Sequence, residues 1–536
     1  MPKIMFRTEE FKIRKELVFW LAISAILIFG FIIRLVNLNH YPISVNQDEL
    51  SNIYDGYAIA ETGADRWGEK YPMILKGFGV ADYRPPMYAW LSAVTIELFG
   101  FSVSSGRLVS AILGCLSLLL LFLVARRMGG RSFAFFALLV AALSPWHIIF
   151  SRTASEGALL PSFFLISACY LWQKGKAKEY TVGYLALLGM CIGLGTNTYQ
   201  AGKLTFFILA LGVLVDIWQH QNKRYRNCLI FGIFCLIGAS PQIVVMLTMS
   251  SQFFSRASMS SVPFSFSFDY FSTILGNIAS NISPDFLFFS SKKYNNLSVA
   301  RLLTVEVLVF YVGLFFVHKA INPKQAIKPS YVYLILFAAI LPSALTVDNP
   351  HALRSSSLLA VLPFITAAGI KVIHQFISNH SLKTIFIVVT PILIIWNGLF
   401  FINTYINSEE LKNLGMQALL VKASKKMNEL KDDYDKIYVE INGNQQYIYI
   451  LTYCNIAPQD FQAGDIEMNY AEWDDFRRMG KYYFVNPSEI EEKAKNDKLN
   501  SLVVLKNRDN RYETLDSVEN LNEKVFFYRR RASSAP

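Results

Sequence analysis

The sequence predicts a polytopic bundle of membrane-spanning α-helices, followed by a small α/β domain at its C-terminal end. The first reason is composition, because the chain is 53% hydrophobic and only 17% charged, whereas an ordinary soluble domain has about 25% charged residues. The second reason is that apolar runs of about 17–25 residues, long enough to cross a bilayer, recur along most of the chain. The third is that residues 404–536 alternate helix-like and strand-like segments instead.

Eleven apolar runs are expected to form the spanning helices, because runs of about this length cross the hydrocarbon core. In chain order they cover residues 17–36, 104–124, 132–150, 157–173, 181–197, 204–218, 227–249, 302–318, 331–347, 355–376 and 383–403. The first run lacks the small-residue cleavage site of a signal peptide, so we expect it to be a retained anchor.

Basic clusters between the runs predict the orientation, because Lys and Arg accumulate in the cytoplasmic loops of membrane proteins. Members of these clusters are Lys12, Arg126, Lys174, Arg224, Lys319 and Lys371. If the spans alternate, all of them lie on one side, so the N-terminus is expected in the cytoplasm and the C-terminus outside. The clusters also account for the net charge of +11 without a nucleic-acid partner. The six cysteines lack metal-ligand spacing, so neither a disulfide framework nor a zinc site is expected.

Three segments on the predicted outer side are too long to be turns, namely residues 37–101, 250–300 and 404–536. The first contains Tyr88–Phe99, which is apolar but too short to span and therefore predicts a helix lying in the membrane interface. The second is rich in Ser and Phe and is expected to be a mobile loop at the lipid boundary. The predicted domains are a membrane domain of residues 1–403 and an extracytoplasmic domain of residues 404–536.

The C-terminal domain is expected to alternate helices with strands. Its helix-like segments are Ser408–Lys431 and Pro487–Lys498, and its strand-like segments are Lys436–Ile441, Lys481–Val485 and Ser501–Leu505. This change of hydrophobic period along the segment favours a small α/β fold.

Asp48 and Glu49 form the clearest polar feature, about ten residues beyond the first apolar run. Adjacent carboxylates in an aromatic loop at the membrane surface can hold a titrating base or a metal ion. They are equally consistent with the first turn of a helix, where the helix dipole favours acidic residues.

Two further segments on the same side place an arginine beside prolines or an acid. Arg84 precedes Pro85 and Pro86, a natural helix entry, and by itself it could be an arginine that reaches the lipid headgroups. Arg152 and Glu156 are four residues apart in a short turn, where they could pair with each other or serve a site.

Lys203, His351 and Arg354 complete the polar groups on the predicted outer side. Lys203 lies between the fifth and sixth runs, and His351 and Arg354 lie between the ninth and tenth. His351 and Arg354 are three residues apart and share a helix face. Arg354 suits a phosphate ligand, because a guanidinium group matches phosphate oxygens, although a lone arginine at the end of a span can also be an anchor.

All of these polar groups lie on the same predicted side of the membrane, and this shared location is more informative than any one of them alone. Almost no ionisable residue lies in the middle of a run, which disfavours a proton-coupled transporter, because that class needs carboxylates or histidines near the bilayer midplane. The pattern favours chemistry on a substrate whose tail lies in the lipid and whose head lies at the outer surface.

These residues and their spacing resemble the GT-C class of membrane glycosyltransferases, in the branch of the protein O-mannosyltransferases and aminoarabinose transferases. Asp48–Glu49 resembles the acidic pair after the first span of that family, and Arg84–Pro86 resembles its basic residue and two prolines before an aromatic helix. Residues 99–108, Glu156 and Pro350–Ser355 resemble further elements of the family. The implied fold is a GT-C type bundle of about eleven spans.

The resemblance implies an inverting transfer of a sugar from a polyprenyl-phosphate carrier to a hydroxyl of a protein, a lipid or a cell-envelope glycan. Asp48 would be the general base that removes the hydroxyl proton, and Arg84 and Arg354 would hold the charge of the phosphate leaving group. Further phosphate contacts would come from Lys203, Arg152 and His351, and the orienting carboxylates would be Glu49 and Glu156.

The resemblance also implies an enzyme without a cofactor, and without a metal ion because the phosphate is already a good leaving group. Its partners would be the lipid-linked donor, an acceptor and membrane lipids, in a plasma membrane. The segment 250–300 lacks the lectin-like insert of the eukaryotic mannosyltransferases, so the resemblance does not identify the acceptor. The alternatives are a transporter or flippase of lipid-linked sugars, a ligase or polymerase that moves whole glycans from a lipid diphosphate, and a receptor-like scaffold.

Overall fold

The computed structural model describes residues 2–42, 45–220, 223–289, 300–321, 328–407, 417–440, 445–469, 475–494, 500–520 and 523–530. The chain divides into two compact units. The bundle unit comprises Met1–Leu38, Ser110–Ile243 and Ser260–Leu411, and the sheet unit comprises Asn39–Val109, Val244–Met259 and Lys412–Pro536. The predicted domain boundary between residues 403 and 404 stays a prediction.

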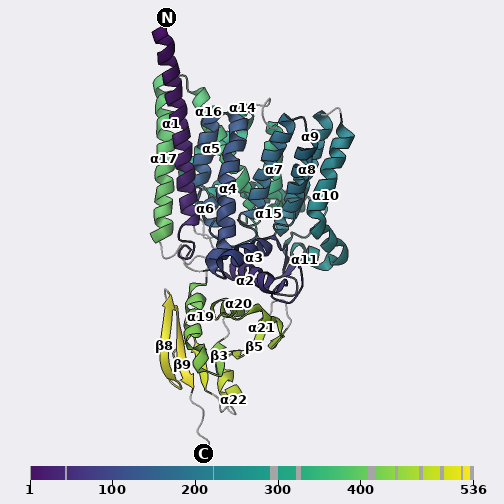
Figure 1. Cartoon of the computed structure of the whole chain (residues 1–536), viewed down its shortest axis with the longest axis vertical. Helices are drawn as coiled ribbons and strands as arrows, with labels where there is room; N and C mark the ends of the chain where they lie inside the picture. The colour runs from purple at the N-terminus through teal and green to yellow at the C-terminus, as the bar shows by residue number, and fades with distance from the viewer. Residues whose placement is uncertain are drawn as a thin grey trace, which may run out of the picture. The chain divides into compact units, whose positions relative to one another are not determined.

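The bundle unit is built from α-helices that run side by side (Figure 1). Its elements are α1 (Pro2–Leu35), most of α4 (Val103–Gly129), α5 (Arg131–Leu143), α6 (Pro145–Phe150), α7 (Leu160–Ala177), α8 (Val182–Gly195), α9 (Gln200–His220), most of α10 (Arg224–Thr248), α12 (Phe268–Ser280), α13 (Pro284–Leu287), the 3₁₀ turns η1 (Thr304–Glu306) and η2 (Ser356–Ala360), α14 (Val307–Ala320), α15 (Pro329–Ala344), α16 (Leu362–Phe376) and α17 (His380–Asn407).

Each of the predicted apolar runs overlaps at least one of these helices. Within the described ranges, five helices are long and apolar enough to cross a membrane. They are Arg14–Leu35, Val103–Gly129, Gln200–Gln219, Arg224–Thr248 and His380–Asn407. The prediction of a helical membrane bundle is confirmed, whereas the number of spans stays a prediction.

Prolines subdivide two of the runs. The run 132–150 breaks after Leu143, and α6 begins at Pro145 behind the N-cap residue Ser144. The run 355–376 starts with the 3₁₀ turn η2, and α16 begins only at Leu362, with Pro363 in its first turn. Proline lacks the N–H of a helix interior and suits a first turn, so these helices restart where hydropathy alone predicts continuity.

Helices α14 and α16 cross at two glycines. A Cβ atom at Gly369 would overlap the carbonyl oxygen of Val309, and one at Gly313 would overlap the carbonyl oxygen of Ile365. Such close backbone contact between apolar helices requires small residues at the crossing point. The pair therefore fixes how these two helices of the bundle pack.

The segment 250–300 is not one continuous loop, although residues 262–267, which carry most of the Phe repeat, are irregular between two helices. It contains α11 (Ser250–Ser260), α12 and α13, and its residues 290–299 lie outside the described ones. Ser267 explains the start of α12, because its hydroxyl accepts a hydrogen bond from Tyr270 N at 3.2 Å. Serine side chains that cap helices resemble loop residues in a sequence, so the helices on either side of this irregular stretch were not predicted.

The sheet unit begins with two helices and a short ribbon. These are α2 (Gln47–Thr62), β1 (Leu75–Lys76), β2 (Tyr83–Arg84) and α3 (Met87–Phe99). The helix predicted over Tyr88–Phe99 is therefore present as α3, and its place in the membrane interface stays a prediction.

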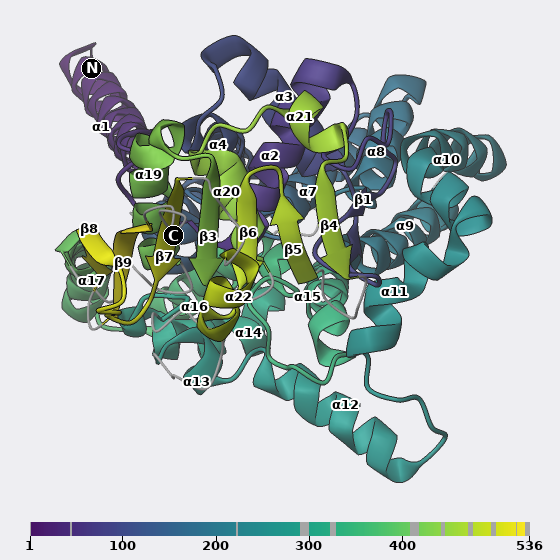
Figure 2. The same cartoon turned by 90° about the horizontal axis from the view of Figure 1, so that it is seen from below.

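The C-terminal part of the sheet unit is a seven-stranded sheet with the order β4-β5-β6-β3-β7-β9-β8 (Figure 2). Its strands are β3 (Lys436–Glu440), β4 (Ile466–Asn469), β5 (Asp475–Met479), β6 (Tyr482–Val485), β7 (Ser501–Leu505), β8 (Glu513–Asn520) and β9 (Glu523–Arg530). The central strand β3 is parallel to β6 and β7, and the outer pairs are antiparallel. The accompanying helices are α19 (Ala418–Leu430), α20 (Gln446–Tyr453), α21 (Pro458–Gln462) and α22 (Ile490–Ala494).

The predicted small α/β domain is thus confirmed, with β3, β6 and β7 at the predicted segments. The outer strands β4, β5, β8 and β9 are additions to the prediction. Of the predicted helices, residues 408–416 and 495–498 lie outside the described ones.

Helix α2 shares its core with the C-terminal domain. Val45, Leu50 and Tyr54 pack into one hydrophobic cluster with residues of α19, α20 and the sheet. The hydroxyl of Tyr54 donates to Ile456 O over 2.8 Å, and that of Tyr449 donates to Val45 O over 3.0 Å. The apolar face of α2 is therefore packed against the C-terminal domain, and this packing fixes the position of its polar face.

Candidate active site

Asp48 and Glu49 lie in the first turn of α2. The side chain of Asn46 caps this helix by accepting a hydrogen bond from Glu49 N at 2.9 Å. The cap and the helix dipole favour acids at these two positions. Asp48 remains partly exposed, whereas Glu49 is fully buried. The two adjacent carboxylates therefore have different surroundings.

Glu49 forms a buried ion pair with Arg107, at the start of α4. Arg107 Nε donates to Glu49 Oε1 at 3.0 Å and its Nη2 donates to Oε2 at 3.2 Å. Arg107 Nη1 also donates to Pro42 O at 2.8 Å. The bidentate geometry ties the beginning of α2 to α4 and fixes the residue next to Asp48.

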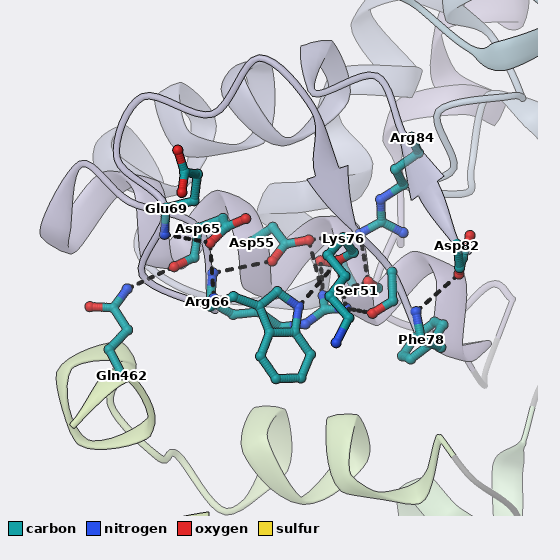
Figure 3. A network of polar contacts seen from close by, with 12 residues as sticks. Ser51, Asp55, Asp65, Arg66, Glu69, Lys76, Phe78, Asp82, Arg84 and Gln462 are labelled. Atoms are coloured by element: carbon teal, nitrogen blue, oxygen red, sulfur yellow. Dashed lines mark hydrogen bonds and ion pairs between the residues drawn. The ribbon is translucent and has the colours of Figure 1, made fainter. Parts of the chain in front are cut away.

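Arg84 is buried in a cluster with two side chains of α2 and a second arginine (Figure 3). Its Nη2 donates to Asp55 Oδ2 at 2.7 Å and to Ser51 Oγ at 2.5 Å. The Nη1 atom of Arg66 donates to the same two atoms, at 3.0 Å and 2.5 Å. Only 5% of the Arg84 surface is exposed. The side chain is therefore buried, unlike an arginine that extends to the lipid headgroups. We call Ser51, Asp55, Arg66 and Arg84 the arginine cluster.

The segment of residues 65–84, which contains β1 and β2, carries the two arginines of the arginine cluster. Arg66 Nη2 donates to Gly77 O at 2.8 Å, and the antiparallel register places Leu75 opposite Arg84. Asp82 closes the turn between the strands by accepting from Phe78 N at 3.0 Å. Gly77 is required there, because a Cβ atom would overlap the Asp82 carboxylate.

Asp65 precedes Arg66 and is a buried carboxylate with an altered pKa. Its Oδ1 accepts hydrogen bonds from Trp67 N at 2.9 Å and from Glu69 N at 3.0 Å. Burial, with the nearby Asp55 carboxylate as the second cause, raises the pKa of Asp65 to about 6. Desolvation and a like charge both disfavour the ionised form, and here they outweigh the two backbone donors.

Arg152 and Glu156 belong to the bundle unit. Arg152 holds the C-terminal end of α1, because its Nη1 donates to Ile33 O at 2.5 Å and its Nη2 to Val36 O at 2.9 Å. A cation at the carbonyl end of a helix is favoured by the helix dipole. Glu156 is buried in the same unit.

Lys203, His351 and Arg354 are also in the bundle unit. Lys203 lies in the first turn of α9 and is half-buried. Arg354 Nη1 donates to Thr346 Oγ1 at 2.9 Å and to Asp348 O at 3.0 Å. The Oδ2 atom of Asp348 also lies 3.5 Å from His351 Nε2. His351 and Arg354 therefore both contact Asp348.

The predicted site residues therefore fall into two sets. Asp48 and Glu49 lie on α2, and Arg84 of β2 is bonded to that helix at Ser51 and Asp55. The other five predicted residues belong to the bundle unit. Whether the two sets share one cavity stays a prediction.

Sequence reasoning missed four residues that the structure places beside the first set, namely Ser51, Asp55, Arg66 and Arg107. A signal for two of them exists, because Asp48, Ser51 and Asp55 are spaced three and four residues apart and so share one face of α2. The pairing of Glu49 with Arg107 joins residues 58 positions apart, which no local pattern predicts.

Comparisons with known proteins identify sequences and structures that this chain resembles. Residues 83–245 match the family model of the dolichyl-phosphate-mannose-protein mannosyltransferases, and this match begins beside Arg84. An undecaprenyl phosphate-α-4-amino-4-deoxy-L-arabinose arabinosyl transferase of Pseudomonas fluorescens is 28% identical over 155 residues, which cover 28% of this chain and 27% of that protein. An uncharacterized protein of Aquifex aeolicus is 29% identical over 134 residues, 24% of this chain and 26% of that protein. The matched segments thus span about a quarter of the length of these relatives.

The fold similarity extends over nearly the whole chain. The crystal structure of ArnT from Cupriavidus metallidurans bound to undecaprenyl phosphate superposes with a TM-score of 0.58 at 12% identity, covering 96% of this chain and 98% of that one. The chain therefore has the ArnT fold. The predicted resemblance to the GT-C class, in the branch of the O-mannosyltransferases and aminoarabinose transferases, is confirmed.

Proposed function

We propose that this chain is an inverting glycosyltransferase that moves a sugar from a polyprenyl-phosphate carrier to an acceptor hydroxyl. The observation that carries the proposal is the buried guanidinium group of Arg84, whose Nε has no hydrogen-bond partner among the described residues. In the arginine cluster one carboxylate faces two guanidinium groups. A phosphate oxygen would complete both the charge and the hydrogen bonding, because guanidinium groups bind phosphate through directed N–H donors.

Asp48 is the proposed general base, and its spacing from Ser51 along α2 supports this role. Ser51, which accepts from Arg84, is three residues after Asp48. One turn of helix separates them by about 5 Å along the axis and leaves them on the same face. The base and the phosphate ligand are thereby supported by one rigid element, as a reaction that requires fixed geometry demands.

The proposed reaction is a single displacement. The oxygen of the acceptor hydroxyl forms a bond to the anomeric carbon of the donor sugar. As it does so, Asp48 accepts the proton of that hydroxyl. The bond between that carbon and the phosphate oxygen breaks, and the electron pair leaves with the lipid phosphate. Arg84 stabilises the charge that develops on the leaving group. Attack from the face opposite the phosphate inverts the anomeric carbon.

Residues of the bundle unit are proposed to complete the site. Arg354 would hold the donor phosphate, with Lys203, Arg152 and His351 as further contacts, and Glu49 and Glu156 would orient the reacting groups. The active face and the C-terminal domain are proposed to lie outside the cytoplasm, as the basic clusters predict.

The relatives support a transferase over a transporter. The aligned Pseudomonas protein is named as an arabinosyl transferase, and the matched family model describes mannosyltransferases. Both names specify a lipid-phosphate sugar or carrier, which is the donor class proposed here. The sugar and the acceptor of this chain are left open by the proposal.

The test is turnover by the full-length protein in lipid nanodiscs with polyprenyl-phosphate monosaccharides. Release of lipid phosphate and transfer of labelled sugar to a cell-envelope extract are measured for the wild type, Asp48→Asn and Arg84→Ala. We expect Asp48→Asn to lose transfer and Arg84→Ala to lose affinity for the donor more than for the acceptor. Glu97→Gln, an exposed acid on α3, is the matched control. Full activity of Asp48→Asn would remove this base from the mechanism, and use of lipid diphosphates alone would favour a glycan ligase.

A further inference from the structure

A pocket of about 460 Å³ lies in the sheet unit beside the arginine cluster. Its volume falls within the range of roughly 300–1,000 Å³ typical of small-ligand sites. One wall comes from the loop that follows α2, and the other from the end of α10 and the start of α11. Its lining includes Asp65, Glu69, Lys70, Lys76, Tyr83 and Met249.

The β1–β2 ribbon separates this pocket from Arg84. Lys76 pairs with Tyr83 and both line the pocket, whereas Leu75 pairs with Arg84 and both are buried. Neighbouring residues of a strand point to opposite faces. The pocket is therefore a second site, distinct from the proposed phosphate site.

Residues 65–67 repeat this alternation. Asp65 and Trp67 line the pocket, while the guanidinium group of Arg66 lies in the arginine cluster. Figure 3 shows Asp65 and Glu69 on this loop and Arg66 bonded to Asp55. The same backbone thus carries the pocket wall and one cation of the cluster.

The charges of the pocket balance. Its lining contains two carboxylates, Asp65 and Glu69, and two ammonium groups, Lys70 and Lys76. A balanced set favours neither a bare phosphate nor a metal cation. It suits an uncharged ligand with many hydroxyls, because carboxylates accept and ammonium groups donate hydrogen bonds.

Aromatic rings supply the complementary surface. Trp67 is fixed by two contacts with Lys76, whose carbonyl accepts from the indole Nε1 at 3.2 Å and whose Nζ lies 4.4 Å from the ring centroid. Tyr71 and Tyr83 line the same pocket. Rings of this kind pack against the apolar C–H face of a sugar while the carboxylates bind its hydroxyls.

The pocket is preorganised and lies at the end of a predicted span. Two backbone donors hold Asp65, and Arg256 of α11 pairs with Asp82 at 2.9 Å, one helical turn after the lining residue Gln252. Val244 and Val245 belong to α10, a helix long and apolar enough to cross a membrane. A ligand in this pocket would thus lie at membrane-surface level.

We propose that this pocket binds a saccharide ring, and, resting on the function proposed above, that it is a sugar subsite of the transfer reaction. Asp65 and Glu69 bind the ring hydroxyls, and Tyr71 and Tyr83 pack against its apolar face, whereas Trp67 is itself packed between Lys76 and the core and supports the pocket wall. The ring comes either from the acceptor or from the donor, and the recognition chemistry is the same for both.

The binding test uses the full-length protein in nanodiscs with a panel of methyl glycosides and no lipid donor. Saturation-transfer NMR should detect at least one hexoside or pentoside on the wild type. Glu69→Gln should weaken that binding by about tenfold, the loss expected for one charge-assisted hydrogen bond, and Met249→Trp should block it by filling the pocket. Glu97→Gln should bind as the wild type does. Absence of binding for every glycoside, or unchanged binding in both pocket variants, would refute the proposal.

Two further measurements identify the source of the ring and separate the two proposals. In turnover assays a donor subsite makes Glu69→Gln raise the donor KM, whereas an acceptor subsite makes it raise the acceptor KM. Arg84→Ala should lose transfer but keep glycoside binding, because it lies on the other face of the ribbon. Glycoside binding by a protein without transferase activity would overturn the proposed function alone. Displacement of the glycoside by inorganic phosphate would overturn the saccharide proposal alone.

Discussion

Arg84 donates to the carboxylate of Asp55 over 2.7 Å, and the two side chains are almost completely buried. Asp55 also receives Arg66, so a single carboxylate separates two guanidinium groups that would otherwise repel each other. Asp55 is thus a positioning residue for Arg84.

The first prediction concerns Asp55→Asn. Removing one partner of a buried ion pair leaves uncompensated charge and costs about 3–5 kcal/mol. We expect a lower melting temperature of the purified protein and a raised KM for the donor, with a smaller change for the acceptor. The control is Glu61→Gln, an exposed acid on the same helix. Equal donor KM values for Asp55→Asn and the wild type would show that Arg84 keeps its place without Asp55.

The second prediction contrasts the adjacent acids Asp48 and Glu49. Glu49→Ala and Arg107→Ala should each lower stability by about 3–5 kcal/mol, because each leaves a buried charge alone. The double variant should lose less than the sum, with a coupling of about 0.5–3 kcal/mol. Asp48→Asn should instead lose activity at an unchanged melting temperature. Additive losses in the Glu49–Arg107 cycle would contradict the ion pair.

The third prediction is a pH dependence from Asp65. Its pKa is raised to about 6 from 3.8, so the folded state binds a proton that the unfolded state releases between about pH 4 and 6. This proton stabilises the fold at low pH, and the contribution disappears as the pH rises to 6. The melting temperature of the wild type relative to Asp65→Asn should therefore fall from pH 4 to pH 6 and stay level above it. A constant difference across that window would exclude the shift.

The fourth prediction tests the crossing of α14 and α16. Gly369→Ala places a methyl group where Val309 O lies, so the helices must separate. Overpacking of this kind costs about 1–3 kcal/mol. Gly232→Ala in α10, where a Cβ atom meets nothing within 4 Å, should be tolerated. Thermal unfolding in detergent compares the two, and equal stability would mean that the crossing can relax.

Hydropathy was enough to predict the long apolar helices of the bundle, because burial in lipid requires such segments whatever their partners, but it did not predict α12 and α13. It did not predict the breaks at Pro145 and Pro363, where the absent N–H of proline matters more than hydrophobicity. Strand β8 (Glu513–Asn520) has no fully buried residue, and its two hydrophobic residues that pack on the core, Leu515 and Val518, do not alternate regularly as the strand pattern requires.

The candidate site was predicted in part for a related reason. Asp48 and Arg84 occur in short local motifs, and such motifs can be read along the chain. Asp55 lies on the same face of α2 as Asp48, but its partners Arg66 and Arg84 come from other segments, as does the partner of Arg107. Ion pairs between distant segments depend on the tertiary fold, and sequence spacing carries no record of them.

The β1–β2 ribbon has a consequence for how such a protein can diversify. Tyr83 and Arg84 are consecutive residues, yet one lines a pocket and the other lies against Asp55. If the pocket binds the proposed saccharide, a substitution at Tyr83 alters the pocket wall while the guanidinium group of the next residue keeps its contacts with Asp55. Related sequences can therefore differ in the pocket wall while they keep the same arginine cluster.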